Sequence, residues 1–258
     1  MRRNLFGYKF YEDVSRSLTH QLLYLEGERF ISERFLIKAF LAEGMTVVDV
    51  GANIGYYLLM FQQSVGQNGK IICIEPSEEN LRELRKNINA NSFSNVKLYE
   101  VAIGMTDGTT GLRSGINAGI VDSGKGAYEV PVKQLASLIS GKVDFIKIDV
   151  EGYEGQVIRG ASEVIMRDRP TLFVEFHPHI LPRFGFTLKG IIEELSRHYT
   201  QKTFFEAIPA DSGIAKKVFY RYFDRHGVKM VEDPDLYIDK YNAGTKIHTF
   251  WAIFQNAQ

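Results

Sequence analysis

The chain has 258 residues, 45% of them hydrophobic, and its 31 basic and 31 acidic side chains give a net charge of zero. This length and apolar content suit one large α/β domain, and the neutral balance argues against a protein built to grip nucleic acid. The single cysteine, Cys73, excludes a disulfide framework and argues against a cysteine-based zinc site.

The N-terminal region, residues 1–44, is predicted to be a helical extension. Its apolar side chains Phe35 and Phe40 would pack toward the first strand, and Gly44 would end the helix. Neither this region nor any later one contains an apolar stretch long enough for a signal peptide or a membrane span. We therefore expect a cytoplasmic protein that does not bind a membrane.

Residues 45–258 are predicted to form the main domain, in which strand and helix patterns alternate. Strands are predicted at 46–51, 70–75, 96–101, 143–149, 171–176, and near 201–208 and 246–254. Helices are predicted at 55–65, after Pro76 with Ser77 as N-cap, at 135–140, at 154–167 and after Thr187. Apolar strands that alternate with helices predict a mostly parallel sheet with helices on both faces. Its ligand would lie at the carboxyl ends of the strands.

Two segments interrupt this alternation. Residues 104–127 contain seven glycines and favour either an extended β excursion or a mobile loop. Residues 209–245 are predicted to be an insertion before the last strand. Within it, residues 216–225 place apolar and basic side chains on opposite helical faces. This pattern suits an acceptor-binding cap, or an ordinary helix packed on the core.

The turn after the first predicted strand reads Asp-Val-Gly-Ala-Asn-Ile-Gly at residues 49–55, and Glu75 follows Gly55 by 20 positions. Such spacing is typical of a βαβ unit that binds an adenosine, in which the distant acid accepts the ribose hydroxyls. A dinucleotide-binding turn has glycine where Asn53 stands, so the pyrophosphate cradle is missing. The pattern instead resembles motif I of methyltransferases that use S-adenosylmethionine (SAM).

Each residue of this predicted SAM site has an alternative interpretation. Asp49 would order the turn or meet the methionine ammonium, whereas the turn as a whole could serve only close strand–helix packing. Glu75 offers two acceptor oxygens to the ribose, or is simply an acid at a helix start. Ala102 and Ile103 would line an adenine slot or belong to the core. The predicted cofactor-binding residues are Asp49, Gly51, Ala52, Asn53, Gly55, Glu75, Pro76, Ala102, Ile103 and Asp149.

The predicted catalytic residues are Asp149, Glu151, Glu175 and His177, which lie at or just past the ends of two later strands. Asp149 and Glu151 would hold a divalent cation, orient an acceptor hydroxyl or face the sulfonium charge; alternatively Glu151 only favours a helix N-terminus. A metal, with Glu175 and His177 as further ligands, is possible but not favoured. His177 would take the hydroxyl proton as a neutral imidazole, with its tautomer set by Glu175, or else bond a backbone carbonyl.

The sequences Ile-Lys-Ile-Asp-Val-Glu-Gly-Tyr-Glu at 146–154 and Val-Glu-Phe-His-Pro at 174–178 resemble the FkbM-type methyltransferases. The glycine turn, the Ile-Glu-Pro at 74–76 and the Ala-Ile-Gly at 102–104 belong to the same resemblance, which covers roughly residues 30 to 180. It implies a Rossmann-like, doubly wound sheet of seven strands, the class I methyltransferase fold, with SAM as cofactor. It also implies O-methylation of a hydroxyl on a sugar, glycan or small metabolite.

Two rival functions stay open from the sequence. A catalytically silent domain would keep the SAM pocket as a binding module. A nucleotide-binding oxidoreductase could use a related sheet, although Asn53 argues against it. The expected partner is a small-molecule or carbohydrate acceptor, with no nucleic acid and no membrane.

Overall fold

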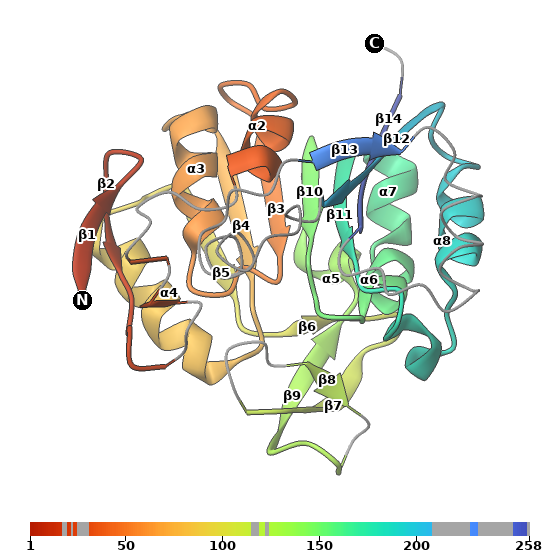
Figure 1. Cartoon of the computed structure of the whole chain (residues 1–258), viewed down its shortest axis with the longest axis horizontal. Helices are drawn as coiled ribbons and strands as arrows, with labels where there is room; N and C mark the ends of the chain where they lie inside the picture. The colour runs from red at the N-terminus through yellow and green to blue at the C-terminus, as the bar shows by residue number, and fades with distance from the viewer. Residues whose placement is uncertain are drawn as a thin grey trace, which may run out of the picture.

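A computed structural model describes residues 1–16, 20–21, 23–24, 31–114, 119–121, 124–207, 228–231 and 250–256. Its centre is an eight-stranded sheet (Figure 1) with the order β13-β12-β14-β11-β10-β3-β4-β5. In that order, the strands span Val228–Val231, Gln201–Ala207, Phe250–Gln255, Thr171–Phe176, Phe145–Ile148, Thr46–Val50, Lys70–Ile74 and Val96–Tyr99. From β11 to β5 all pairings are parallel, whereas β14 and β12 pair antiparallel with their neighbours. The mostly parallel sheet is thus confirmed, and β13 adds an eighth strand to the seven expected.

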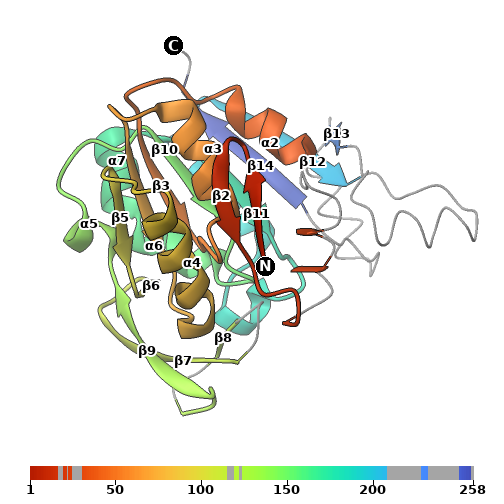
Figure 2. The ribbon, with the colours of Figure 1, turned by 90° about the vertical axis from the view of Figure 1, so that its left-hand side faces the viewer.

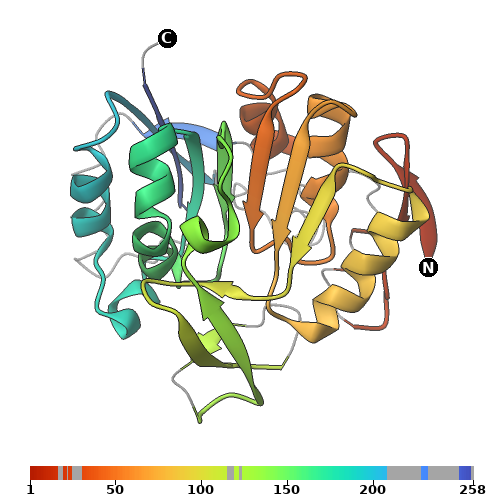
Figure 3. The same cartoon turned by 180° about the vertical axis from the view of Figure 1, so that it is seen from behind.

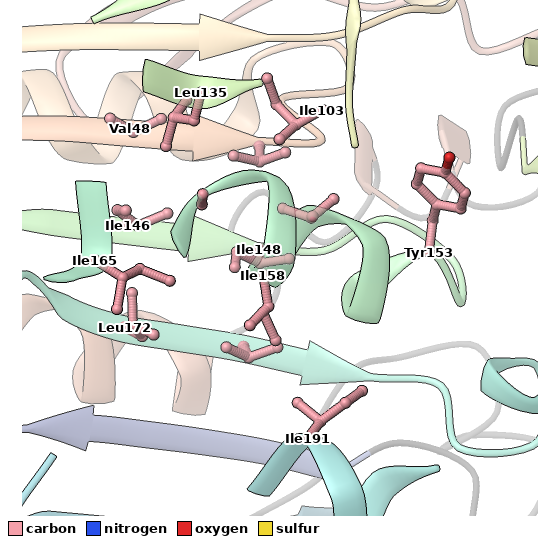
Figure 4. Close-up of a cluster of buried hydrophobic side chains, with 14 of the residues drawn as sticks. Val48, Ile103, Leu135, Ile146, Ile148, Tyr153, Ile158, Ile165, Leu172 and Ile191 are labelled. Atoms are coloured by element: carbon pink, nitrogen blue, oxygen red, sulfur yellow. The ribbon is translucent and has the colours of Figure 1, made fainter. Parts of the chain in front are cut away.

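Helices cover both faces of this sheet, as predicted, and Figures 1 and 3 show the two layers from opposite sides. One layer contains α2 (Ile31–Lys38), α3 (Tyr56–Val65) and α4 (Glu78–Ala90), and the other contains α5 (Leu135–Leu138), α6 (Glu154–Gly160), α7 (Ser162–Asp168) and α8 (Leu188–Leu195). Successive strand residues point to opposite faces, so Val47 packs with α3 and α4 while Val48 packs with α6 and α7. Figure 4 shows the hydrophobic cluster that contains Val48, on the α6 and α7 side of the sheet, with Tyr153 beyond the arrowheads of the strands.

The glycine-rich segment forms a small second sheet, which confirms the β excursion. Its strands are β6 (Ala102–Ile103), β9 (Tyr128–Lys133), β7 (Gly108–Leu112) and β8 (Ile120–Val121), in that spatial order. Figure 3 shows this sheet below the carboxyl ends of β3 and β4. It therefore stands where a ligand of the main sheet is expected.

The helical prediction is wrong at the start of the chain. There β1 (Arg2–Leu5) and β2 (Tyr8–Tyr11) form an antiparallel hairpin that lies beside α4 (Figure 2). Phe6 and Gly7 both have positive φ, 53° and 89°, which suits a two-residue hairpin turn. The side chain of Asn87 in α4 accepts a hydrogen bond from the Tyr11 N–H at 2.6 Å. The turn glycine and this tertiary contact override the helical pattern, and the division of the chain at residue 44 stays a prediction.

Other predicted boundaries differ by a few residues. The helix expected at 154–167 is two helices, α6 and α7, which meet at Ala161. Ser77 and Thr187 are the N-caps predicted for α4 and α8, since their side chains accept the N–H groups of Asn80 and Gly190. Apart from β13, the insertion at 209–245, with its amphipathic segment, lies outside the described residues. No described helix combines the length and apolar character needed to cross a bilayer.

Candidate functional site

The glycine turn joins β3 to α3 and brings β3 close to β10. Gly51 has a φ of +85°, and a Cβ atom there would lie 1.8 Å from the carbonyl oxygen of Asp149. At Gly55, with a φ of +87°, a Cβ atom would lie 2.7 Å from Leu84 Cδ1. Gly51 therefore needs glycine because a side chain would clash with the backbone of Asp149, and Gly55 needs it because of its left-handed φ. Both are demands of the protein's own conformation and packing, as in the alternative interpretation. Asn53 also has a left-handed φ of 49°, which asparagine adopts more readily than most residues.

Glu75 follows β4 and is held by donors on both of its oxygens. Its Oε2 accepts the Asn53 N–H at 2.8 Å, and its Oε1 accepts the Ser77 N–H at 2.9 Å and the Asn80 amide at 3.3 Å. Burial raises the pKa of Glu75 to about 6, although these hydrogen bonds oppose the shift. The carboxylate is thus fixed in place, and it retains acceptor capacity on its remaining lone pairs.

A pocket of about 600 Å³, open to solvent, lies at the carboxyl ends of β3, β4 and β10. Of the predicted cofactor residues, it is lined by Gly51, Asn53, Glu75, Pro76, Ala102, Ile103 and Asp149. Asp49, Ala52 and Gly55 do not line it. The predicted site residues left out eight lining residues: Val50, Ile74, Asn80, Val101, Ile120, Val150, Tyr153 and Val157. Ile120 belongs to the small sheet, so the β excursion contributes an apolar wall.

Asp49 has a buried partner, Lys147, that the sequence interpretation missed. The two residues are direct neighbours in the β3–β10 register, and Lys147 Nζ lies 3.5 Å from Asp49 Oδ1 and 3.4 Å from Asp149 Oδ2. Burial raises the pKa of Asp49, against the opposing effect of Lys147. Burial alone lowers the pKa of Lys147, but the carboxylates of Asp49, Asp149 and Glu175 outweigh it and keep the ammonium charged. A lysine inside an otherwise apolar strand was the available signal.

Asp149, Glu151 and His177 come together at the edge of the pocket. One potential ligand atom from each lies within 4.8 Å of the others. The turn after β10 makes this possible, because Glu151 has a left-handed φ of 52°. His177 follows β11 and is 8% exposed, and its Nε2 lies 3.5 Å from Glu151 Oε2. Asp149 and Glu151 line the pocket, whereas His177 stands behind them.

The acid that contacts the His177 ring is Glu154, not Glu175 as predicted. Glu154 begins α6, is fully buried, and its Oε1 lies 2.8 Å from His177 Nδ1. The same oxygen accepts the Gly152 N–H at 2.8 Å. Glu175 lies in β11, where its antiparallel partner is Trp251, and it does not belong to the cluster. Burial, and then the charge of Asp149, raise the pKa of Glu175 well above its ordinary value.

The protonation of His177 differs from the neutral imidazole expected. Burial alone lowers the pKa of His177, but the bond to Glu154 and the nearby carboxylates outweigh it and raise the pKa to about 9. Burial also raises the pKa of Glu151, against the charge of His177. In the free protein at neutral pH the cluster thus holds an imidazolium among carboxylates, an arrangement that favours a positive charge.

Residues 49–203, more than half of the chain, match the family described as "Methyltransferase FkbM domain". A protein-L-isoaspartate O-methyltransferase of Methanococcoides burtonii is 31% identical over 72 residues, which are 28% of this chain and 33% of that protein. The crystal structure of an FkbM methyltransferase from Methylobacillus flagellatus is 22% identical, with a TM-score of 0.41, and the match covers 52% of this chain and 33% of that one. The chain therefore spans about a third of the length of these two relatives. A SAM-dependent O-methyltransferase structure from Thermotoga maritima is 12% identical, with a TM-score of 0.45, over 94% of this chain and 72% of that one.

Proposed function

The chain belongs to the FkbM methyltransferase family, and we propose that it transfers the methyl group of SAM to a hydroxyl oxygen of a small-molecule or carbohydrate acceptor. The observation that carries this proposal is a single pocket lined by Glu75 after β4 and by Asp149 and Glu151 after β10. Because β3 lies between these strands, the two groups of residues are two strand spacings apart, about 10 Å. One extended ligand can then reach both.

In this proposal the cofactor lies across the glycine turn. Glu75 would accept the ribose hydroxyls on its remaining lone pairs, and Ala102, Ile103 and Ile120, which line the same pocket, would pack against the adenine. Asp149, which lines the same pocket, would then face the sulfonium and its methyl group. A carboxylate there stabilises the positive charge of the sulfonium.

The reaction is an in-line displacement. The acceptor oxygen forms a bond to the methyl carbon, the carbon–sulfur bond breaks, and its electron pair stays on sulfur to give S-adenosylhomocysteine. The hydroxyl proton passes to a carboxylate of the cluster, Asp149 or Glu151, whose oxygens lie within 4.8 Å of the protonated His177 ring. SAM is already reactive, so the main contribution of the protein is to align oxygen, carbon and sulfur.

Two measurements test this proposal. Calorimetry with SAM, S-adenosylhomocysteine and NAD should give binding of the first two and none of NAD, because Asn53 replaces the glycine of a pyrophosphate cradle. Labelled SAM should then transfer its methyl to a member of pooled sugars, glycans and hydroxylated metabolites. Binding of SAM with no transfer to any pool would indicate the silent binding module, and binding of NAD alone would indicate the oxidoreductase.

A further inference from the structure

The cluster at the edge of the pocket consists of residue types that bind metal ions, and its histidine is held by a buried carboxylate. We infer that Asp149, Glu151 and His177 bind one divalent cation of the Mn²⁺ type, with two carboxylates and one imidazole as protein ligands. The use we assign to this cation, holding the acceptor, rests on the proposed function. Binding of the cation itself does not.

The spacing of the three side chains fits a single ion. Oxygen and nitrogen ligands bind such ions at about 2.0–2.2 Å, so two ligands on opposite sides are about 4.2 Å apart. The ligand atoms of Asp149, Glu151 and His177 all lie within 4.8 Å of one another. Ligands at right angles are only about 3 Å apart, so completing the site needs movements of up to about 2 Å. The turn that holds Glu151 ends at Gly152, which also has positive φ.

The surroundings of His177 distinguish this cluster from an ordinary group of surface acids. Metal-bound histidines commonly donate their second ring N–H to a carboxylate, which fixes the tautomer and the ring orientation. Glu154 is placed for this role, since its fully buried Oε1 lies 2.8 Å from Nδ1. Among the described residues, the only hydrogen bond of the ring is this one at Nδ1. Nε2 is directed at Glu151, at 3.5 Å, longer than a usual hydrogen bond of about 2.7–3.2 Å.

The charges around the cluster also favour a cation. Four carboxylates, those of Asp149, Glu151, Glu154 and Glu175, lie close enough to interact electrostatically with His177 or with another of the four. Lys147 faces them, but its ammonium also contacts the buried Asp49. A divalent cation at Nε2 replaces the ring proton and adds positive charge where the carboxylates are concentrated.

The donor set selects the class of ion and of acceptor. Carboxylates suit Mg²⁺ and Mn²⁺, and imidazole suits later transition metals, so Mn²⁺ is compatible with both ligand types. Three protein ligands leave positions open on an ion that prefers six. Acceptors with two neighbouring oxygens, such as vicinal diols of sugars or hydroxycarbonyl compounds, can fill two of these positions and present one hydroxyl to the methyl group.

The test uses the full chain after treatment with EDTA and its removal. MnCl₂ is titrated into the protein, and free Mn²⁺ is measured by electron paramagnetic resonance. We expect one site per chain in the parent, at least about 10-fold weaker binding in Glu151→Gln and His177→Gln, and about 10–100-fold weaker binding in Glu154→Gln. His179→Gln is the matched control, because this exposed histidine lies in the same turn but outside the cluster, and its Mn²⁺ affinity should equal that of the parent.

The outcomes separate the cation site from the proposed function. Circular dichroism and binding of S-adenosylhomocysteine in EDTA report on folding and on the cofactor site of every variant. A parent that binds S-adenosylhomocysteine but shows no specific Mn²⁺ site overturns the inference and leaves the proposed function intact; the cluster would then be a plain His177–Glu151 ion pair. Unchanged Mn²⁺ affinity in both folded ligand variants also overturns it. A chain that binds Mn²⁺ but neither SAM nor its product supports the cation site and contradicts the proposed function.

Discussion

The two ends of the pocket are built in different ways. At the cofactor end, the backbone N–H groups of Asn53 and Ser77 fix Glu75, and these residues lie within a single βαβ unit. At the opposite end, side chains hold one another: Glu154 contacts His177, and Lys147 contacts Asp149. Backbone donors are set by the fold and do not titrate. In a group of charged side chains, by contrast, removing one residue changes the contacts and the charge of the others. Substitutions at the first end should therefore change cofactor affinity alone, and those at the second should change turnover.

The largest expected effect concerns turnover. His177→Ala should lower kcat by about 10²–10⁴-fold, the usual contribution of groups that assist proton transfer, because it removes the imidazolium that contacts the accepting carboxylate of Glu151. SAM affinity should change by no more than a few-fold. Single-turnover transfer from labelled SAM and calorimetry measure the two quantities. If His177→Ala keeps parental turnover with the same acceptor, the cluster is not the reacting end, and the contrast between the two ends fails.

The next effect concerns the free energy of unfolding and the ion pair between β3 and β10, the strands that lie between the two ends of the pocket. Lys147→Met removes the cation that faces the fully buried Asp49, and it should lower the free energy of unfolding by about 3–5 kcal/mol, since an unpaired buried charge remains. The double variant Lys147→Met with Asp49→Asn should recover part of this loss. Urea unfolding measures both. Equal stability of Lys147→Met and the parent would show that the ion pair at 3.5 Å contributes little.

At the cofactor end, Glu75→Ala should weaken SAM binding by about 1–3 kcal/mol, because partner groups lose a charged acceptor. Glu78→Ala is the matched control, since this acid lies exposed in the first turn of α4 and should leave SAM affinity unchanged. Calorimetry measures the affinities and thermal unfolding checks the fold. An unchanged affinity in a folded Glu75→Ala protein would reduce Glu75 to an acid at a helix start.

The smallest effect is a pH dependence of cofactor binding. Burial raises the pKa of Glu75 to about 6, so the carboxylate is charged above this pH and gains a proton as the pH falls through it. Protonation removes acceptor capacity, and SAM affinity should decrease a few-fold between pH 7 and pH 5. Glu75→Gln should lack this dependence. Parallel decreases in both proteins would assign the titration to another group.

Local patterns predicted most of the elements. The strand at 171–176 agrees with its predicted bounds, and the caps Ser77 and Thr187 are where the helix-start signals placed them. These features depend on contacts between residues close in sequence. The N-terminal hairpin was missed because two of its determinants, packing of β2 against α4 and the contact with Asn87, come from far along the chain.

The sequence by itself determined the βαβ order, the glycine turn and Glu75 after the second strand, because spacing along the chain fixes all three. It also placed Asp149, Glu151 and His177 at strand ends. Only the tertiary structure decided that Lys147 is the partner of Asp49, since that contact depends on the register of β10 against β3. It likewise assigned Glu154 to His177, because the start of α6 and the residue after β11, 23 positions apart, come into contact only in the folded chain. Residue order predicts which groups reach an edge of the sheet, and strand register and helix packing decide which of them touch.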